Sequence, residues 1–256
     1  SIITVASIIF IIIYILVNGI PNLTTDLFSL HYNSKNQSML PSIFNTVFIT
    51  FLTLLIAVPI GIFSAVYLVE YAKKGSKLVK VIRVTTETLA GIPSIVFGLF
   101  GFLAFVIALG WGYSMIAGVL TLVMMVLPTI IRTTEEALLA VPNSYREGSF
   151  GLGAGKIRTI FKIIVPTAIP GILSGVILAI GRIVGETAAL IYTSGTVAET
   201  ATSLTDSART LSVHLYCLLS EGLFTEQAYA TAVILLLLVV GINALSNFIA
   251  KKLAKK

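Results

Sequence analysis

Residues 132–167 read RTTEEALLAVPNSYREGSFGLGAGKIRTIFKIIVPT, a polar stretch punctuated by glycines between two apolar runs. This stretch is too long and too patterned to be a simple turn. Ser144 and Glu147 have the S-x-x-E spacing of a capping box, and Pro142 precedes them, so we expect a helix to begin near Ser144. After the glycines, the basic run 156–162 indicates a second, amphipathic helix. We therefore predict a compact protrusion on which another protein docks.

The chain on both sides of this protrusion has the composition of an integral membrane protein. Of its 256 residues, 57% are hydrophobic and 11% are charged, whereas soluble domains carry about 25% charged residues. Apolar runs long enough to cross a bilayer, about 20 residues each, recur throughout. We expect a single all-α membrane domain over residues 1–256 with six spans: 1–17, 45–70, 86–109, 114–131, 168–192 and 228–249. Because the first run begins at Ser1 and no small-residue cleavage site follows it, we expect a span whose preceding residues are missing, and not a signal peptide.

Positive charge is concentrated on one side of these predicted spans. Basic residues gather between the second and third spans, between the fourth and fifth, and at the C-terminus. The other two long loops, 18–44 and 193–227, contain one basic residue each, Lys35 and Arg209. By the positive-inside rule the basic segments are cytoplasmic, which places both termini inside. The net charge of +6 therefore indicates membrane orientation and does not indicate binding to nucleic acid.

Motifs for catalysis and for nucleotide binding are missing from the sequence. A Walker motif, G-x-x-x-x-G-K-[ST], fails at Gly155 because Phe150 occupies the first glycine position and Ile157 the Ser or Thr position. We interpret Glu135 and Glu136 as solvated helix-end charges that point in different directions. We interpret His31 and His214 as single residues of external loops. We interpret Cys217 as a buried apolar residue without a disulfide partner. The sequence therefore predicts no catalytic residue, no metal site and no cofactor held by this chain.

The opening stretch resembles the EAA loop of ABC importer permeases, over about residues 143–166. The pattern of that loop is Glu-Ala-Ala, a glycine four places after the second alanine, and Ile-x-Leu-Pro ten places later. The matching residues are Glu147, Gly153, Ile163 and Pro166, and the replacements are Gly148, Ser149 and Val165. In that family the loop docks on a separate ATPase subunit, so the resemblance makes Glu147 and Gly153 the docking candidates.

Longer segments resemble the phosphate-specific branch of these permeases, nearest to the PstA type. They include GIPSIVFGLFG, PGILSGVILAIGRIVGETAAL and HLYCLLSEGLFTEQAYATAVILLLLVV, and the resemblance covers most of residues 86–245. It implies a MetI-like permease that is embedded in the lipid of a bacterial or archaeal cytoplasmic membrane. The solute that it implies is inorganic phosphate. The implied partners are a second, PstC-like permease subunit, a homodimeric PstB-like ATPase that binds ATP and Mg, and an extracytoplasmic PstS-like phosphate-binding protein. An ABC importer for another oxyanion or small solute, or a secondary transporter, remains an alternative.

The stretch GRIVGETAAL, residues 181–190, places two charges inside the fifth predicted span. Ionisable side chains in a span usually face a polar cavity or the interior of a helix bundle. Arg182 and Glu186 are four residues apart, so on one helix they would form an ion pair with a structural role. The alternative is a substrate path in which the planar donor fork of Arg182 binds phosphate. Glu186 would then hold Arg182 and accept a proton from a P–OH group, and Thr187 and Thr193 would add hydroxyl donors.

Glycines mark the places where we expect helices to approach one another closely. The fifth predicted span contains two GxxxG patterns, Gly171 with Gly175 and Gly181 with Gly185, and small residues at this spacing let a second helix pack tightly. The glycine-rich run GIPSIVFGLFG, residues 91–101, is likewise better suited to helix contact than to lipid. Helix packing alone explains most of these glycines.

Overall fold

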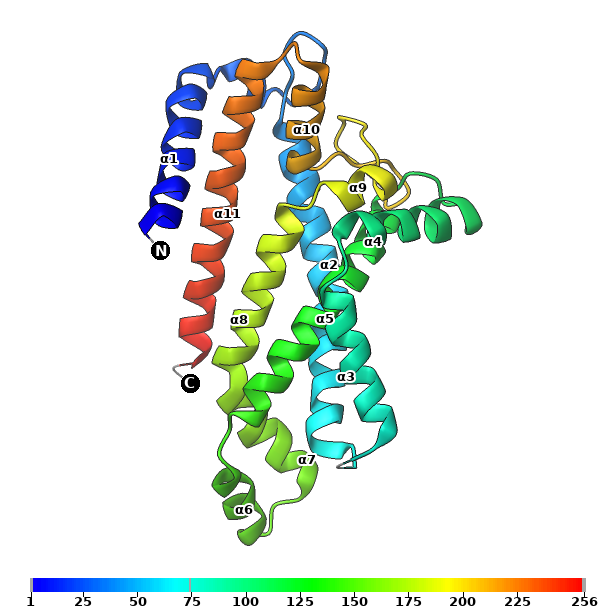
Figure 1. Cartoon of the computed structure of the whole chain (residues 1–256), viewed down its shortest axis with the longest axis vertical. Coiled ribbons are helices and arrows are strands. Elements are labelled where there is room, and N and C mark those ends of the chain that lie inside the picture. The colour runs from blue at the N-terminus through cyan, green and yellow to red at the C-terminus, as the bar shows by residue number, and fades with distance from the viewer. Residues whose placement is uncertain (1, 74, 255–256) are drawn as a thin grey trace. The chain divides into compact units, whose positions relative to one another are not determined.

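The computed structural model describes residues 2–73 and 75–254, and no strand occurs among them. Short 3-10 turns and three π-helical segments supplement the α-helices. The expected all-α architecture is therefore confirmed. The α-helices (Figure 1) are α1 Ile2–Gly19, α2 Leu40–Val66, α3 Lys77–Ala90, α4 Ser94–Gly101, α5 Met115–Leu139, α6 Asn143–Gly151, α7 Lys156–Thr159, α8 Val165–Val184, α9 Ala188–Thr193, α10 Leu211–Glu221 and α11 Thr225–Ala254.

Five helical segments of the described chain are long and apolar enough to cross a membrane. They are Ile3–Asn22, Leu40–Tyr71, Met115–Leu139, Lys156–Val184 and Thr225–Phe248. A sixth span exists only if the bent pair α3 and Ser94–Ala108 counts as one. The third predicted span, 86–109, is therefore not one helix. Pro93 has no backbone N–H and disfavours the helical conformation of the residue before it, which accounts for the break at 91–93.

The described chain divides into two compact units. The first consists of residues 1–51, 94–121 and 184–241, and the second of residues 52–93, 122–183 and 242–256. Neither unit is a continuous stretch of sequence, because the division falls within α2, α5, α8 and α11. The expected single domain over residues 1–256 stays a prediction.

In the second unit, α8 packs closely on α5 through two glycines. A Cβ atom added to Gly171 would lie 2.6 Å from Cβ of Ala137, and one added to Gly175 would overlap the hydroxyl of Thr133. The first predicted GxxxG contact is therefore confirmed. The second is not found at Gly181, where an added Cβ would meet no described atom within 4 Å. The helix ends three residues later, at Val184.

In the first unit, α4 packs on α9, also through glycine. A Cβ atom added to Gly98 would lie 2.7 Å from Cα of Ala189, and one added to Gly101 would overlap Thr121. Helix contact by the run 91–101 is thus confirmed. Residue Asn45 of α2 fixes the connection between α9 and α10, because its amide donates to the carbonyl oxygen of Glu199 at 2.9 Å and its Oδ1 accepts the N–H of Ala201 at 3.0 Å.

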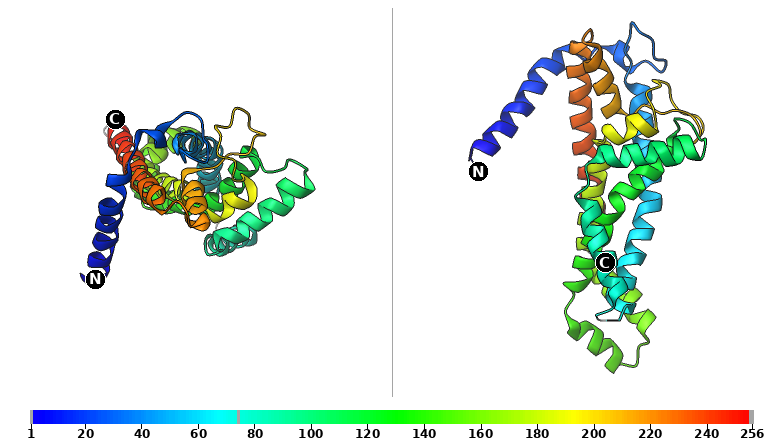
Figure 2. Two further views of the ribbon diagram at one scale, coloured as in Figure 1. Left: turned by 90° about the horizontal axis from the view of Figure 1, so that it is seen from above. Right: turned by 45° about the vertical axis from the view of Figure 1, so that its right-hand side comes forward.

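Helix α1 has few neighbours within the first unit. Its C-terminal end contacts the start of α11, where the hydroxyls of Tyr14 and Tyr229 lie 3.4 Å apart. Toward its N-terminus α1 diverges from α11 (Figure 2), and 6% of its most apolar window is buried. An apolar helix with this exposure is suited to contact lipid or another membrane subunit.

Candidate functional site

The two charges of residues 181–190 do not form the predicted pair on one helix. Helix α8 ends at Val184, and the chain is non-helical from Gly185 to Thr187 before α9 begins. Glu186 therefore does not lie one helical turn beyond Arg182. Its carboxylate instead accepts the backbone N–H of Ala189 at 3.0 Å, which holds the first turn of α9.

Glu186 is buried, and its backbone is held by a second hydrogen bond. Its side chain lies in the interior of the first unit, with 8% of the residue exposed. The hydroxyl of Ser212, on α10, donates to the carbonyl oxygen of Glu186 at 2.6 Å. A carboxylate offers about four acceptor positions, and among the described residues one donor, the N–H of Ala189, uses them. The carboxylate can therefore accept a further hydrogen bond.

Arg182 lies half-buried in the last turn of α8. No residue described in its own unit makes a hydrogen bond or an ion pair with its guanidinium group. A guanidinium carries five N–H donors, and an unsatisfied charge on an apolar helix is costly. Arg182 is thus suited to bind an anion that carries several acceptor oxygens.

The two threonines expected near this site differ in their hydrogen bonds. Thr193 is buried in α9 and donates to the carbonyl oxygen of Ala189 at 2.8 Å, so its donor is used by its own helix. Thr187 makes one long hydrogen bond, 3.4 Å, to the carbonyl oxygen of Gly185. Of the two hydroxyls, the one of Thr187 is the more easily offered to a ligand.

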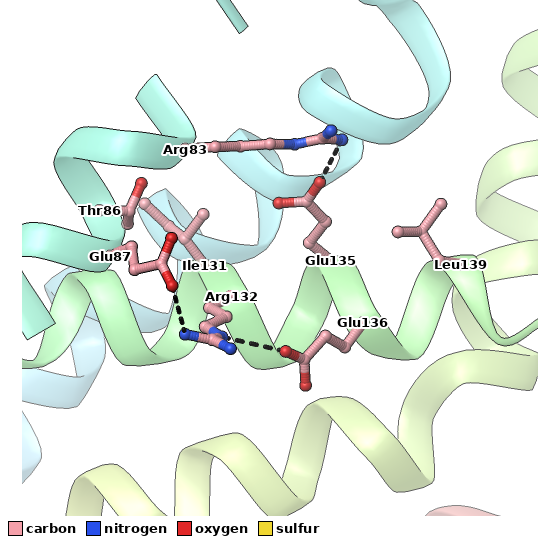
Figure 3. A pocket seen from close by; sticks show the side chains of 8 residues that line it. All are labelled: Arg83, Thr86, Glu87, Ile131, Arg132, Glu135, Glu136 and Leu139. Carbon is pink, nitrogen blue, oxygen red and sulfur yellow. Dashed lines mark hydrogen bonds and ion pairs between the residues drawn. The ribbon is translucent and has the colours of Figure 1, made fainter. Parts of the chain in front are cut away.

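A charged cavity of about 290 Å³ lies between α3 and α5 in the second unit (Figure 3). Figure 3 shows Glu135 directed from α5 toward Arg83, with which it forms an ion pair. Arg132 pairs with Glu136 at 3.0 Å and more loosely with Glu87 at 3.9 Å. The complete lining is Arg83, Thr86, Glu87, Ile131, Arg132, Glu135, Glu136 and Leu139.

This cavity corrects the interpretation of one glutamate. Glu136 is exposed, as expected, but Glu135 is buried with 8% exposure and is not a solvated helix-end charge. The two point in different directions, as adjacent helical residues must. The pair with Arg83 joins residues 52 positions apart and has no sequence signature, whereas the i,i+4 spacing of Arg132 and Glu136 does. Because both arginines are paired and carboxylates outnumber them, the cavity is poorly suited to hold an anion.

The protrusion expected from residues 132–167 is formed by α6 and α7. The hydroxyls of Ser149 and Thr159, 2.8 Å apart and buried, join the two helices. The predicted capping box is wrong, because α6 begins at Asn143 with Pro142 at its N-cap and no side-chain cap. Ser144 therefore lies within the first turn.

Both docking candidates lie on the surface of the protrusion. Glu147 on α6 and Gly153 after it are exposed, and Gly153 has a φ of +78°, a left-handed conformation that favours glycine. Apolar side chains stand exposed beside them, with Phe150 at 48% and Leu152 at 91%. An exposed mixed surface of this kind is suited to a protein partner.

The sequence indicated that His214 is a single residue of an external loop, and this interpretation is wrong. It is buried on α10, where its Nδ1 lies 3.3 Å from Nη1 of Arg209 and its ring meets Tyr32 edge-on. Burial, assisted by the charge of Arg209, lowers the pKa of His214 to about 4. No group of three His, Cys, Asp or Glu side chains in the described part of the chain is arranged to hold a metal ion.

Comparison with known proteins identifies the family. Residues 57–256 match the family model described as "Binding-protein-dependent transport system inner membrane component". A "Probable ABC transporter permease protein YqgI" of Bacillus subtilis is 33% identical over 95% of this chain and 88% of that protein. A "Phosphate transport system permease protein PstA 1" of Mycobacterium tuberculosis is 45% identical over 55% of this chain, but the match covers 45% of that protein.

Solved structures show the same fold at low sequence identity. A chain of the MetNI methionine ABC transporter, in inward-facing conformations, superimposes with a TM-score of 0.62 at 19% identity, over 94% of this chain and 97% of that one. A chain of a bacterial alginate ABC transporter, solved with a periplasmic protein that binds an alginate pentasaccharide, has a TM-score of 0.72 at 16% identity, over 99% of this chain and 94% of that one.

Proposed function

Because the chain belongs to the binding-protein-dependent transport system inner membrane components, and is thus an ABC importer permease, we propose that it forms the membrane path for inorganic phosphate. One observation carries the proposal most: Arg182, on an apolar helix, has no partner described in its own unit. The names of partial relatives, such as the mycobacterial PstA 1 and the PstA of Xylella fastidiosa, support phosphate as the solute.

Within this path, Arg182, Glu186 and Thr187 are the residues that bind phosphate. The planar fork of Arg182 matches the oxygens of a tetrahedral anion. The acceptor position left on the Glu186 carboxylate receives the proton of a P–OH group, and Thr187 donates its hydroxyl. Sulfate carries no proton at neutral pH, so the carboxylate favours phosphate over sulfate. A second permease subunit, PstC-like, supplies another basic residue to the same path.

The energy source in this proposal is a separate, homodimeric ATPase of the PstB type, which binds ATP and Mg. It docks on the exposed face of α6 around Glu147 and Gly153. This chain therefore moves solute and does not itself hydrolyse ATP. An extracytoplasmic PstS-like protein delivers phosphate. The chain lies in the cytoplasmic membrane with its basic segments and both termini inside.

Copurification and substitution together test the proposal. The complete transporter in detergent should retain its ATPase, whereas a secondary transporter would be isolated without one. In vesicles that contain the transporter, Arg182→Gln should abolish ATP-dependent phosphate uptake at normal abundance in the membrane, and Arg182→Lys should restore little of it, because an ammonium lacks the planar fork. Normal uptake by Arg182→Gln would exclude Arg182 from the path, and loss of the protein from the membrane would indicate a structural role.

A further inference from the structure

We infer that the ion pair of Arg146 and Glu70 is the joint that carries movement of the docking helix α6 to α2. This inference rests on the proposed function, in which an ATPase binds α6. Arg146 is on α6, and Glu70 is on the π-helical segment Tyr67–Tyr71 that continues α2. The two residues are 76 positions apart in the sequence and belong to the same unit.

The guanidinium of Arg146 is fully engaged. Its Nε and Nη2 donate to Oε1 of Glu70 at 3.0 and 2.7 Å. Nη2 also donates to the carbonyl oxygen of Leu138 at 3.1 Å, and Nη1 to that of Val141 at 3.0 Å. One side chain therefore ties together the end of α2, the end of α5 and the start of α6. A lysine ammonium lacks the fork needed to hold all three.

Burial makes this joint stiff. The side chains of Arg146 and Glu70 are 17% and 10% exposed. Separating a buried pair strands a charge away from water, which is strongly unfavourable, whereas exposed pairs separate at little cost. When α6 is displaced, the segment that carries Glu70 must therefore follow it. The helix after α6 also touches this segment, since Lys156 of α7 lies 4.6 Å from the centre of the Tyr71 ring, but this lysine is exposed.

Arg146 is next to Glu147, a docking candidate, so force from a docked ATPase would reach the ion pair. Adjacent residues on a helix point in different directions: Arg146 faces the unit interior, while Glu147 is exposed. Glu70 lies in a π-helical turn, and such turns occur frequently at functional sites. A force on the exposed face of α6 therefore acts on the same helical turn that carries the contact of Arg146 with Glu70.

The test uses the complete transporter in proteoliposomes, with phosphate transported and ATP hydrolysed measured together. Glu70→Gln and Arg146→Lys should still copurify with the ATPase and hydrolyse ATP, while phosphate moved per ATP falls about tenfold or more, a loss of about 1.4 kcal/mol of coupling. Lys80→Gln, which removes an exposed charge of α3 in the same unit, should leave that ratio unchanged. If a single variant fails to fold, Glu70→Gln with Arg146→Gln leaves no charge stranded and should fold but remain uncoupled.

The outcomes separate the two proposals. If Glu70→Gln, Arg146→Lys and the double variant keep the wild-type ratio, the joint is overturned and the proposed function stands. If the wild-type chain itself retains no ATPase or moves no phosphate, the proposed function fails first. An uncoupled double variant with normal abundance and normal ATP hydrolysis supports the joint.

Discussion

The carboxylate of Glu186 accepts the backbone N–H of Ala189 at 3.0 Å, and Ala189 is the residue against which Gly98 of α4 packs. A charge in an apolar stretch therefore organises the start of α9 where α4 packs on it. Glu186 has a structural role that does not require Arg182. This arrangement leaves the transport role of Glu186 as a separate, testable property.

Substitution of Glu186 should separate these two roles. Glu186→Ala removes the acceptor for Ala189 N–H, and loss of such a helix-start acceptor costs about 1 kcal/mol, so the midpoint of thermal unfolding in detergent should fall. Glu186→Gln keeps an acceptor oxygen and should unfold near the wild-type midpoint, yet lose phosphate uptake because an amide does not take up a proton. Normal uptake by Glu186→Gln would leave only the structural role.

Two glycines of α8 should respond to alanine in opposite ways. Gly171→Ala places a methyl group 2.6 Å from Cβ of Ala137, and such overpacking costs about 1–3 kcal/mol. Gly181→Ala meets no described atom within 4 Å and gains helix propensity of up to about 1 kcal/mol. Thermal unfolding of both variants in one detergent gives the comparison, and equal midpoints would contradict the close packing of α8 on α5.

The ion pairs of the charged cavity should differ in strength. Arg83→Gln leaves the buried carboxylate of Glu135 without its partner, which should destabilise the protein by about 1–3 kcal/mol. Arg132→Gln removes the exposed pairs to Glu136 and Glu87 and should cost little stability, because solvent screens such pairs. The check is the denaturant midpoint of each variant, and a larger loss for Arg132→Gln would reverse the assignment.

The buried His214 predicts a loss of stability in acid. Its folded pKa, about 4, is below the ordinary value of 6.5, so between these values the unfolded chain binds a proton that the folded chain does not. Stability should therefore fall as the pH is lowered from about 6.5 to 4, by at most about 1.4 kcal/mol per pH unit. His214→Gln should flatten this part of the profile in thermal unfolding scans, while the exposed His31→Gln should leave it unchanged.

Local sequence patterns predicted much of this fold, but they did not predict its long-range contacts. Hydropathy and charge indicated the all-α fold, five of the six expected apolar spans as single helical segments, and the protrusion at α6, because these depend on runs of neighbouring residues. The end of α8 at Val184 was missed because Gly185 is a weaker break signal than proline. The pairs Arg83–Glu135 and Arg146–Glu70 join separate helices, and single-sequence spacing carries no information about them.

Uptake of labelled phosphate tests the central proposal most directly. The transporter is placed in proteoliposomes with ATP inside and the binding protein outside, and initial uptake is measured with and without a tenfold excess of sulfate. A tenfold excess offsets a difference in binding free energy of roughly 1.4 kcal/mol. We predict ATP-dependent accumulation of phosphate that sulfate does not reduce. Equal competition by sulfate, or uptake that does not need ATP, would contradict the assignment of this chain to ATP-driven phosphate import.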